Sequence, residues 1–440
     1  MSKLAAPRGT ADVYPPESAR WQALEARIHA LARRFGYGEI RTPVFEATEL
    51  FVRGVGESTD IVEKEMYTFT DKGGRSLTLR PEWTAPVVRA LLQHNMLESL
   101  PQRLYYIGSF FRYERPQEGR QRQAHQFGVE CFGIAAPEAD AEVIQLAYEL
   151  IRSYQIPGVV LRINSIGDAN DRPSYREKLL AHFRPHLNSL SADSQRRLER
   201  NPLRILDSKA PEDRDLVASA PTFLESLSPE NRKHFEGVQR ALDAMGIRYE
   251  VEPRLVRGFD YYTRTVFQFD SDDLGAQNTI CGGGRYDDLV HSLGGQPTPG
   301  VGFGLGLERF LIVLDKTGAN PALEREGIFA IALGERAQVA LLPVIAALRR
   351  RTDVDFPIVT DFTERKLDRQ LKRADRVNAR AAVILGDNEL ESGILAARDL
   401  VARSQEPLPV LYSGSVDEGA EMILSWYRRL RPAAAIAEAV

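Results

Sequence analysis

The sequence has little cysteine and no long apolar run. Its 440 residues include only two cysteines, Cys131 and Cys281, which are too few for a disulfide framework or for a zinc site built from cysteines. No segment approaches the length of an apolar membrane span, and the N-terminal stretch MSKLAAPRGTADVYPPE has no apolar core of signal-peptide length. We therefore expect a protein of the reducing cytoplasm that contacts no membrane.

Two familiar phosphate-binding patterns are also missing. The stretch GVGFGLGLERF has glycines at Gly302, Gly304 and Gly306, but the dinucleotide fingerprint needs its third glycine three residues after the second. The P-loop motif, in which a lysine follows a glycine-rich loop, does not occur. These absences exclude the Rossmann and P-loop classes of nucleotide site.

Charge and length limit the architecture more than the function. A formal net charge of -4 argues against a surface coated with basic residues for nucleic acid, although local basic patches are enough to contact phosphates. Net charge therefore does not decide whether the protein binds RNA. A length of 440 residues exceeds one ordinary core and predicts two or three domains.

The most informative stretch is residues 105–132, where two apolar and aromatic runs flank the polar segment ERPQEGRQRQ. This pattern predicts a long antiparallel hairpin. Because side chains alternate along a strand, Gln126 and Glu130 share one face, and the other face carries Phe127, Val129 and Cys131. If Arg112 lies beside Gln126 and Glu130, that face suits a zwitterionic ligand or a phosphate. The alternative, favoured for an isolated hairpin, is a solvated face with an incidental ion pair.

The segment FRYERPQEGRQRQ, followed by HQFGVE, resembles motif 2 of class II aminoacyl-tRNA synthetases, in the form found in the histidyl-tRNA synthetase family. The resemblance implies that Arg112 holds the α-phosphate of ATP. It also implies that Gln126 and Glu130 hold the amino-acid substrate, histidine. Neither ligand needs the polar loop, which is expected to contact the acceptor end of the tRNA through residues of its tip, Arg115, Gln117 and Arg122.

A second segment, LRPEWTAP, resembles the LRPEGT segment of the same family. Residues 77–80 predict a short strand, and Pro81 opens a helix. By resemblance, Glu82 and Thr84 in the first turn of this helix contact histidine. The alternative for Glu82 is a favourable interaction with the helix dipole alone. Trp83 replaces the commoner glycine, and we expect it to alter access to the pocket.

A third segment, RLVRGFDYYTRTVFQFD, begins at Arg254 and reads as an aromatic strand. A plain sheet with outward polar groups would fit this pattern. The segment nevertheless resembles one that is nearly diagnostic of histidyl-tRNA synthetases. The resemblance implies that Arg257 takes the place of a metal ion at the α-phosphate, and that Tyr261 and Tyr262 line the histidine pocket.

Two glycine-rich segments complete the pattern. CGGGRYDDLV predicts only a turn, because consecutive glycines permit positive φ. GVGFGLGLERF resembles motif 3 of class II synthetases, which implies that Arg309 contacts the terminal phosphate of ATP. No metal site built from protein side chains is expected, and Mg²⁺ is expected to accompany ATP, held partly by phosphate oxygens.

The fold class implied by the resemblance is α+β. It comprises a catalytic domain over residues 1–320, with an antiparallel sheet flanked by helices and a charged helical insertion at about 168–245. A strand broken at Pro43 corresponds to motif 1, which lies at the dimer interface in this family. Residues 327–430 alternate between β and α patterns, which predicts a mostly parallel sheet covered by helices.

This C-terminal domain resembles the class IIa anticodon-binding domain. One of its predicted helices is basic, and its cations suit either RNA phosphates or a solvated face; they are Arg365, Lys366, Arg369, Lys372 and Arg373. Thr363 and Glu364 stand before this helix, where the family usually has two glycines.

Together these resemblances imply an ATP-dependent ligase that activates L-histidine and transfers it to the 3′ end of tRNA(His), working as a homodimer. The carboxylate of histidine is the nucleophile, so the first step requires no activated side chain. One alternative is a catalytically inactive regulatory subunit of ATP phosphoribosyltransferase, but such relatives usually lack the C-terminal domain and an intact LVRGxDYYTR segment. Another, an RNA-binding adaptor, leaves the substrate-pocket residues unexplained.

Overall fold

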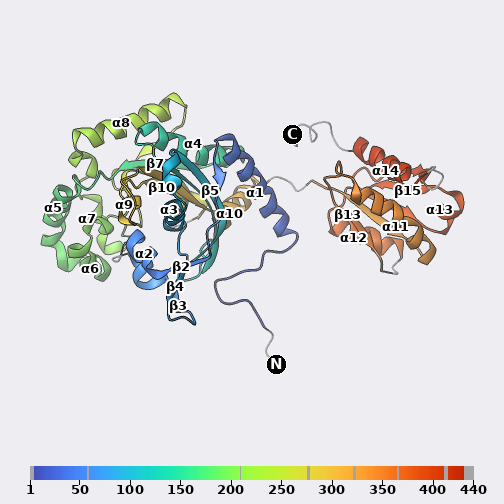
Figure 1. Cartoon of the computed structure of the whole chain (residues 1–440), viewed down its shortest axis with the longest axis horizontal. Helices are drawn as coiled ribbons and strands as arrows, with labels where there is room; N and C mark the ends of the chain where they lie inside the picture. The colour runs from blue at the N-terminus through green and yellow to red at the C-terminus, as the bar shows by residue number, and fades with distance from the viewer. Residues whose placement is uncertain are drawn as a thin grey trace. The chain divides into compact units, whose positions relative to one another are not determined.

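A computed structural model of the chain describes residues 4–56, 59–208, 210–274, 278–320, 324–363, 366–410 and 415–430. Its contacts divide the chain into two units, Met1–Pro321 and Ala322–Val440, which are considered separately below (Figure 1). Within the described ranges, no helix is both long and apolar enough to cross a membrane. Glu364 and Arg365, which the sequence singles out, lie outside these ranges.

The first unit is built on an eight-stranded sheet with the order β1-β5-β6-β11-β10-β9-β7-β8. The pairings from β5 to β7 are all antiparallel, and only the edge strands β1 and β8 pair in parallel. This confirms the predicted antiparallel sheet. The strands are β1 (Gly38–Glu39), β5 (Gln102–Phe111), β6 (Gln123–Phe132), β7 (Val159–Ser165), β8 (Glu250–Val251), β9 (Thr263–Ser271), β10 (Thr279–Arg285) and β11 (Gly300–Gly306).

One face of this sheet is packed with helices. Phe127, Val129 and Cys131 of β6 lie in one core cluster with apolar side chains from these helices, so the predicted inward face of the hairpin is confirmed. Apolar residues at helical spacing, such as Ile28 and Ile144, supply the other half of the core. The helices are α1 (Glu17–Arg34), α4 (Pro137–Ser153), α8 (Pro229–Ala244) and α10 (Leu307–Thr317).

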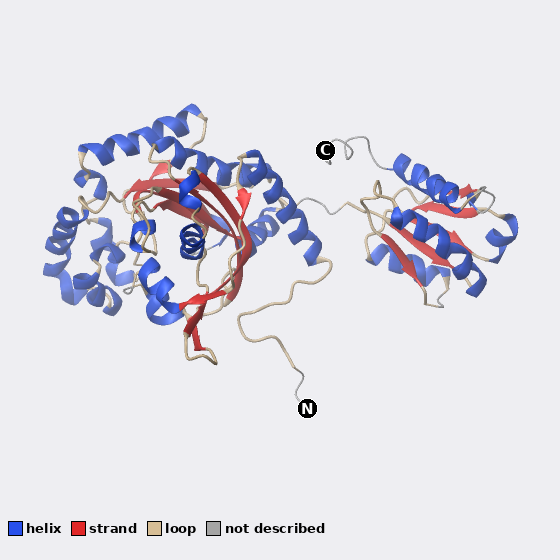
Figure 2. Ribbon diagram, in the orientation of Figure 1, coloured by secondary structure: helices blue, strands red, loops and turns tan. Residues whose placement is uncertain are grey.

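The other face of the sheet curves around α3 (Thr84–Gln93), as Figure 2 shows. Here α3 and the aromatic side chains of β5 and of the segment after β10 share a second core cluster. Beside α3 lies a small sheet with the order β2-β4-β3, whose members are β2 (Phe45–Ala47), β3 (Tyr67–Thr70) and β4 (Ser76–Leu79). Pro43 separates β1 from β2, so the predicted strand is broken where proline removes a backbone donor. The following residues form α2 (Thr48–Val55).

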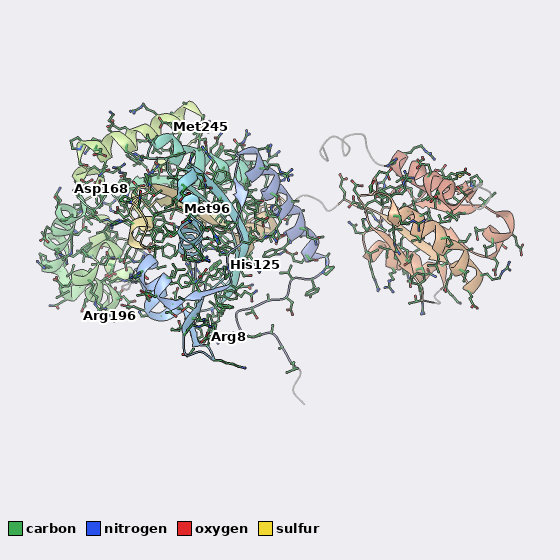
Figure 3. All side chains as sticks on the ribbon, in the orientation of Figure 1. Arg8, Met96, His125, Asp168, Arg196 and Met245 are labelled. Carbon is green, nitrogen blue, oxygen red and sulfur yellow. The ribbon has the colours of Figure 1, made fainter. Side chains whose placement is uncertain are left out.

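The insertion between β7 and β8 is helical, as the sequence predicts. It contains α5 (Arg172–Phe183), α6 (Ala192–Arg200), α7 (Arg214–Ala218) and short 3-10 turns, among them η4 (Pro202–Ile205). The predicted range of about 168–245 also includes α8, which packs on the large sheet instead. In Figure 3 the labelled Arg196 lies on α6, and Asp168 lies just before α5. The apolar side chains of the insertion, including Tyr175 and Phe183, belong to the core cluster that also contains α3.

Three local predictions were wrong. The helix expected to open at Pro81 begins only at Thr84, so Glu82 stands before its first turn. The segment from Arg254 to Tyr262 is an irregular loop, and β9 begins only at Thr263. CGGGR is not a turn but the end of the central strand β10. The glycines serve close approach there, because a Cβ at Gly283 would overlap the backbone of Gly302 on β11.

The second unit contains a five-stranded sheet with the order β13-β12-β14-β15-β16. β12 (Ile328–Ala332) pairs in parallel with β13 (Ile358–Asp361) and β14 (Ala381–Leu385), whereas β15 (Leu395–Asp399) and β16 (Gln405–Leu408) are antiparallel. The expected parallel sheet is therefore limited to three strands. Its helices are α11 (Glu335–Arg350), the basic α12 (Leu367–Arg376), α13 (Asp387–Ser392) and α14 (Val416–Leu430).

Candidate active site

A cavity of about 440 Å³ opens on the α3 side of the large sheet. Strand register explains why it gathers polar groups: Gly108 pairs with Gln126 and Phe110 with Ala124, so Arg112, two residues further, continues the face of Gln126. The predicted juxtaposition of Arg112 and Gln126 is confirmed. The cavity is lined by the predicted residues Glu82, Thr84, Arg112, Gln126, Arg257, Tyr261, Tyr262 and Arg309.

Glu130 lies beneath this lining and is only 1% exposed. Its carboxyl group accepts hydrogen bonds from Thr84 Oγ1 at 2.8 Å, from Tyr106 Oη at 3.2 Å and from the hydroxyl of Tyr286. Burial raises the pKa of Glu130 to about 8, although these hydroxyl groups oppose the shift. A Cβ at the facing Gly302 would overlap the carboxyl group, so β11 needs glycine at that position.

Glu82 has two roles in the structure. Its carboxylate accepts the backbone N–H of Thr84 at 2.6 Å and of Ala85 at 2.8 Å, which caps the first turn of α3. The expected interaction with the helix start is therefore confirmed. The same side chain lines the cavity, and burial raises its pKa.

Arg257 lies flat against the sheet. Its Nη1 donates to Gln268 Oε1 of β9 at 3.2 Å. A Cβ at Gly282 of β10 would overlap the guanidinium group, so the glycine makes room for the arginine. The guanidinium thus has a defined seat on the wall of the cavity.

Three arginines of the cavity lining lie around Glu114; they are Arg112, Arg120 and Arg309. Glu114 pairs with Arg120 at 3.0 Å and lies 3.9 Å from Arg112, whose Nε donates to Pro81 O at 2.8 Å. Burial, and after it the charge of Arg120, lowers the pKa of Arg309 to about 10. Cations held close together in this way favour a polyanionic ligand. Arg120 lines the cavity but was not predicted, because the sequence assigned its loop to tRNA alone.

Four tyrosines surround the Glu130 region. Tyr261 lies 4.7 Å from Tyr262 and 5.6 Å from Tyr286, measured between ring centroids. Tyr106 and Tyr286 both line the cavity, and neither was predicted. Tyr286 follows the glycines that the sequence assigned to a turn, and Tyr106 lies on the predicted polar face of β5. Only that face assignment could have identified Tyr106.

Trp83 is built into the wall and is 3% exposed. Its ring stacks on Tyr106 at 4.5 Å with an interplanar angle of 6°. On the ring lies the guanidinium of Arg80, 3.4 Å from the centroid. Trp83, which was expected to change access to the cavity, therefore also supports the ring of Tyr106, whose hydroxyl donates to Glu130.

The polar loop divides into a tip and a base. Arg115 and Gln117 are exposed. Arg122 is not at the tip, contrary to the prediction: its guanidinium lies 3.9 Å from the ring centroid of Tyr113, and its backbone N–H donates to Gly9 O at 2.7 Å. These contacts hold Arg122 at the base of the hairpin.

His125, labelled in Figure 3, lies near the start of β6. Its Nδ1 is 2.8 Å from Oε1 of Glu308 on α10, the residue before Arg309.

Comparison with known proteins agrees with this geometry. The family model described as Histidyl-tRNA synthetase matches residues 9–310. The chain belongs to the histidyl-tRNA synthetase family. A second model, described as Anticodon binding domain, matches residues 331–425.

Individual relatives cover most of the chain. A protein named Histidine–tRNA ligase from Desulforamulus reducens is 48% identical over 403 residues, which cover 91% of this chain and 95% of that protein. One of the same name from Moorella thermoacetica is 49% identical over 409 residues, covering 92% and 95%. The crystal structure of apo S. aureus histidyl-tRNA synthetase gives a TM-score of 0.78 at 34% identity, covering 97% of this chain and 100% of that one.

Family membership confirms the class II fold and makes the chain an ATP-dependent aminoacyl-tRNA synthetase. The match to the anticodon-binding domain bears on the regulatory-subunit alternative, because that domain is the part such subunits usually lack. The ligase interpretation is therefore favoured over the regulatory one.

Proposed function

We propose that this chain joins L-histidine to tRNA(His) in two steps, at the cavity between α3 and the large sheet. In the first step the histidine carboxylate attacks the α-phosphorus of ATP, forming histidyl-adenylate and releasing pyrophosphate. In the second, a hydroxyl group of the terminal ribose of tRNA attacks the histidyl carbonyl and AMP leaves. The observation that carries the proposal is one continuous cavity that several arginines line, with the tyrosine-bonded carboxyl group of Glu130 directly beneath the lining.

The two kinds of side chain suit the two substrates. Glu82, Thr84, Gln126, Glu130, Tyr261 and Tyr262 supply hydrogen-bonding groups and flat rings for a small, polar, aromatic amino acid. Arg112, Arg257 and Arg309 supply positive charge for the triphosphate. Since histidine brings its own nucleophile, catalysis depends on positioning and on stabilising the charge that develops at the α-phosphorus. Arg112 and Arg257 are assigned that second task.

Magnesium is proposed to enter with ATP as part of the substrate. Mg²⁺ in such sites keeps most of its ligands from phosphate and water, with one or two carboxylates. In the described residues no group of three or more histidine, cysteine, aspartate or glutamate side chains is arranged to hold a metal ion. A phosphate-held ion is compatible with that side-chain set.

A homodimer is proposed on the exposed side of the small sheet. Phe45 of β2 and Phe69 of β3 are 51% and 44% exposed, and their rings pack edge to face at 6.3 Å. Contiguous exposed apolar surface is typical of protein–protein interaction sites. Phe45 lies within the segment around Pro43 that corresponds to motif 1 by resemblance. The second unit, with its basic helix α12, is proposed to contact the anticodon in the cytoplasm.

The test is exchange of labelled pyrophosphate into ATP. We expect exchange that requires L-histidine and that no other common amino acid supports, because a wrong substrate would leave buried polar groups unpaired. Attachment of histidine to tRNA(His) measures the second step. A folded sample that performs neither reaction with MgATP present would reject the ligase and favour the regulatory alternative.

The loop tip gives a prediction about the second step. Replacing Arg115 and Gln117 together with alanine should leave adenylate formation close to parental and slow transfer to tRNA, because both side chains are exposed and neither lines the cavity. The matched control is Arg75→Ala, an arginine that is 79% exposed on the β3–β4 turn. Equal losses in pyrophosphate exchange and in aminoacylation would assign the tip to the first step instead.

Trp83 gives a prediction about stability. Trp83→Gly should destabilise the fold by about 3 to 5 kcal/mol, as large-to-small core changes do, and should raise the KM for histidine because Tyr106 loses its stacking partner. Trp83→Phe keeps an aromatic ring against Tyr106 and Arg80 and should cost much less. Urea denaturation and steady-state exchange measure the two effects. A glycine variant with parental stability and KM would show that the stack is dispensable.

A further inference from the structure

The loop from Arg257 to Tyr262 has no regular secondary structure, yet it presents four side chains to the cavity, those of Arg257, Phe259, Tyr261 and Tyr262. Its backbone contact with the α2 segment is long: the N–H of Asp260 lies 3.4 Å from Val55 O. A loop without a backbone ladder is positioned by side chains that bond its carbonyl groups. The insertion supplies such side chains.

Arg172, the first residue of α5 in the insertion, holds the C-terminal half of this loop. Its Nη1 donates to the backbone oxygen of Asp260 at 3.3 Å, and its Nη2 donates to that of Tyr262. The side chain is largely removed from water. A buried guanidinium that bonds two carbonyl groups fixes both in direction as well as distance.

Two residues that follow α6, Asn201 directly after it and Arg204 in η4, hold the other half. Arg204 Nη1 donates to the backbone oxygen of Arg257 at 3.2 Å, and the Arg204 side chain is 14% exposed. Asn201 Nδ2 donates to Asp260 Oδ1 at 2.9 Å. Both ends of the loop are therefore bonded to the insertion.

The same part of the insertion reaches a second wall of the cavity. Arg197 pairs with Asp60 at 2.8 Å, and Arg204 lies 3.6 Å from the same carboxylate. Asp60 precedes Ile61, which lines the cavity. Arg204 thus connects the loop that bears Arg257 with the segment that bears Ile61.

We infer that the helical insertion sets the geometry of the first reaction step, with Arg172 and Arg204 acting as positioning residues for Arg257, Tyr261 and Tyr262. Neither arginine lines the cavity, so their effect is transmitted through the backbone of the loop. A displacement of about 1 Å in a catalytic group can slow a reaction a hundredfold. The inference rests on the proposed function, because adenylate formation is the step it concerns.

The test measures single-turnover adenylate formation by the full chain without tRNA. Arg204→Ala and Arg172→Ala should each slow the step by between about tenfold and a hundredfold at saturating substrates, while the KM for ATP changes less. The matched control, Arg184→Ala, removes an arginine that pairs with Glu199 inside the insertion, where both side chains are more than half exposed. This control should react at the parental rate.

Lysine substitutions separate positioning from simple docking. Arg204 donates to one loop carbonyl group, and a lysine ammonium can also pair with the Asp60 carboxylate, so Arg204→Lys should recover most of the rate. Arg172 bridges two carbonyl groups, so Arg172→Lys should recover little. If Arg172→Ala fails to fold, the Arg204 pair decides the question. Variants that melt earlier but form adenylate at the parental rate per folded molecule would overturn the inference. An inactive parental protein would instead overturn the proposed function.

Discussion

Arg257→Ala is expected to slow histidyl-adenylate formation by on the order of 10² to 10³-fold, the scale seen when one preorganised transition-state donor is lost. The guanidinium is seated between Gln268 and Gly282 on the cavity wall, so it need not reorganise as negative charge develops. An interaction that is stronger in the transition state than in the ground state appears chiefly in the rate. Histidine and ATP affinities should therefore change much less. Single-turnover kinetics beside equilibrium binding measure both.

Gly282→Ala offers an independent route to the same result. The added methyl group would occupy the place of the guanidinium and displace it without removing its charge. It should therefore slow adenylation as well. If Arg257 only stabilises the sheet, Arg257→Ala would lower the melting temperature and leave adenylation per folded molecule nearly intact. That outcome would contradict a catalytic role for Arg257.

The hairpin shows how much of the site the sequence could predict. Strand alternation is a local property, so the opposite faces of Phe127 and Gln126 followed from the pattern and are confirmed. Arg112 joined the same face for the same reason. Where a role depended on matching a family segment, the structure brings the residues to one cavity, and their individual contacts with substrate stay predictions.

What the sequence could not predict depends on contacts between distant segments. Tyr286 and Glu130 are 156 residues apart in the sequence. They meet because Tyr286 follows β10, and because β10 and β6 both pair with β11. The loop before β9 looked like a strand because it is aromatic, but Arg172 and Arg204 bond its carbonyl groups in place of a neighbouring strand. The sequence placed Arg122 at the loop tip, but its contacts with Tyr113 and Gly9 hold it at the base of the hairpin.

Glu130 gives the second large prediction, which concerns pH. Burial is the main cause that raises its pKa to about 8, so in the free protein the carboxyl group is mostly protonated below that pH. The ionised form is the better acceptor for an N–H group of histidine. Because a carboxyl group with a raised pKa gains its charge only as the pH passes that value, kcat/KM for histidine should rise toward about pH 8 and then level off.

Glu130→Gln isolates this effect, because glutamine keeps the shape of the side chain and cannot ionise. We expect it to lower kcat/KM for histidine by on the order of 10² at alkaline pH, where the parental carboxylate is charged, a scale consistent with loss of a buried charged partner. Histidine itself titrates near pH 6.5, but identically with both proteins, so the ratio of parental to variant kcat/KM removes that contribution. This ratio should fall by on the order of tenfold from about pH 8.5 to about pH 6.5, as protonation takes the parental carboxylate away. Pyrophosphate exchange across this range measures it, with the KM for ATP as the internal control. A large ratio that does not vary with pH would mean that Glu130 is ionised throughout, and a ratio near one would remove it from the histidine site.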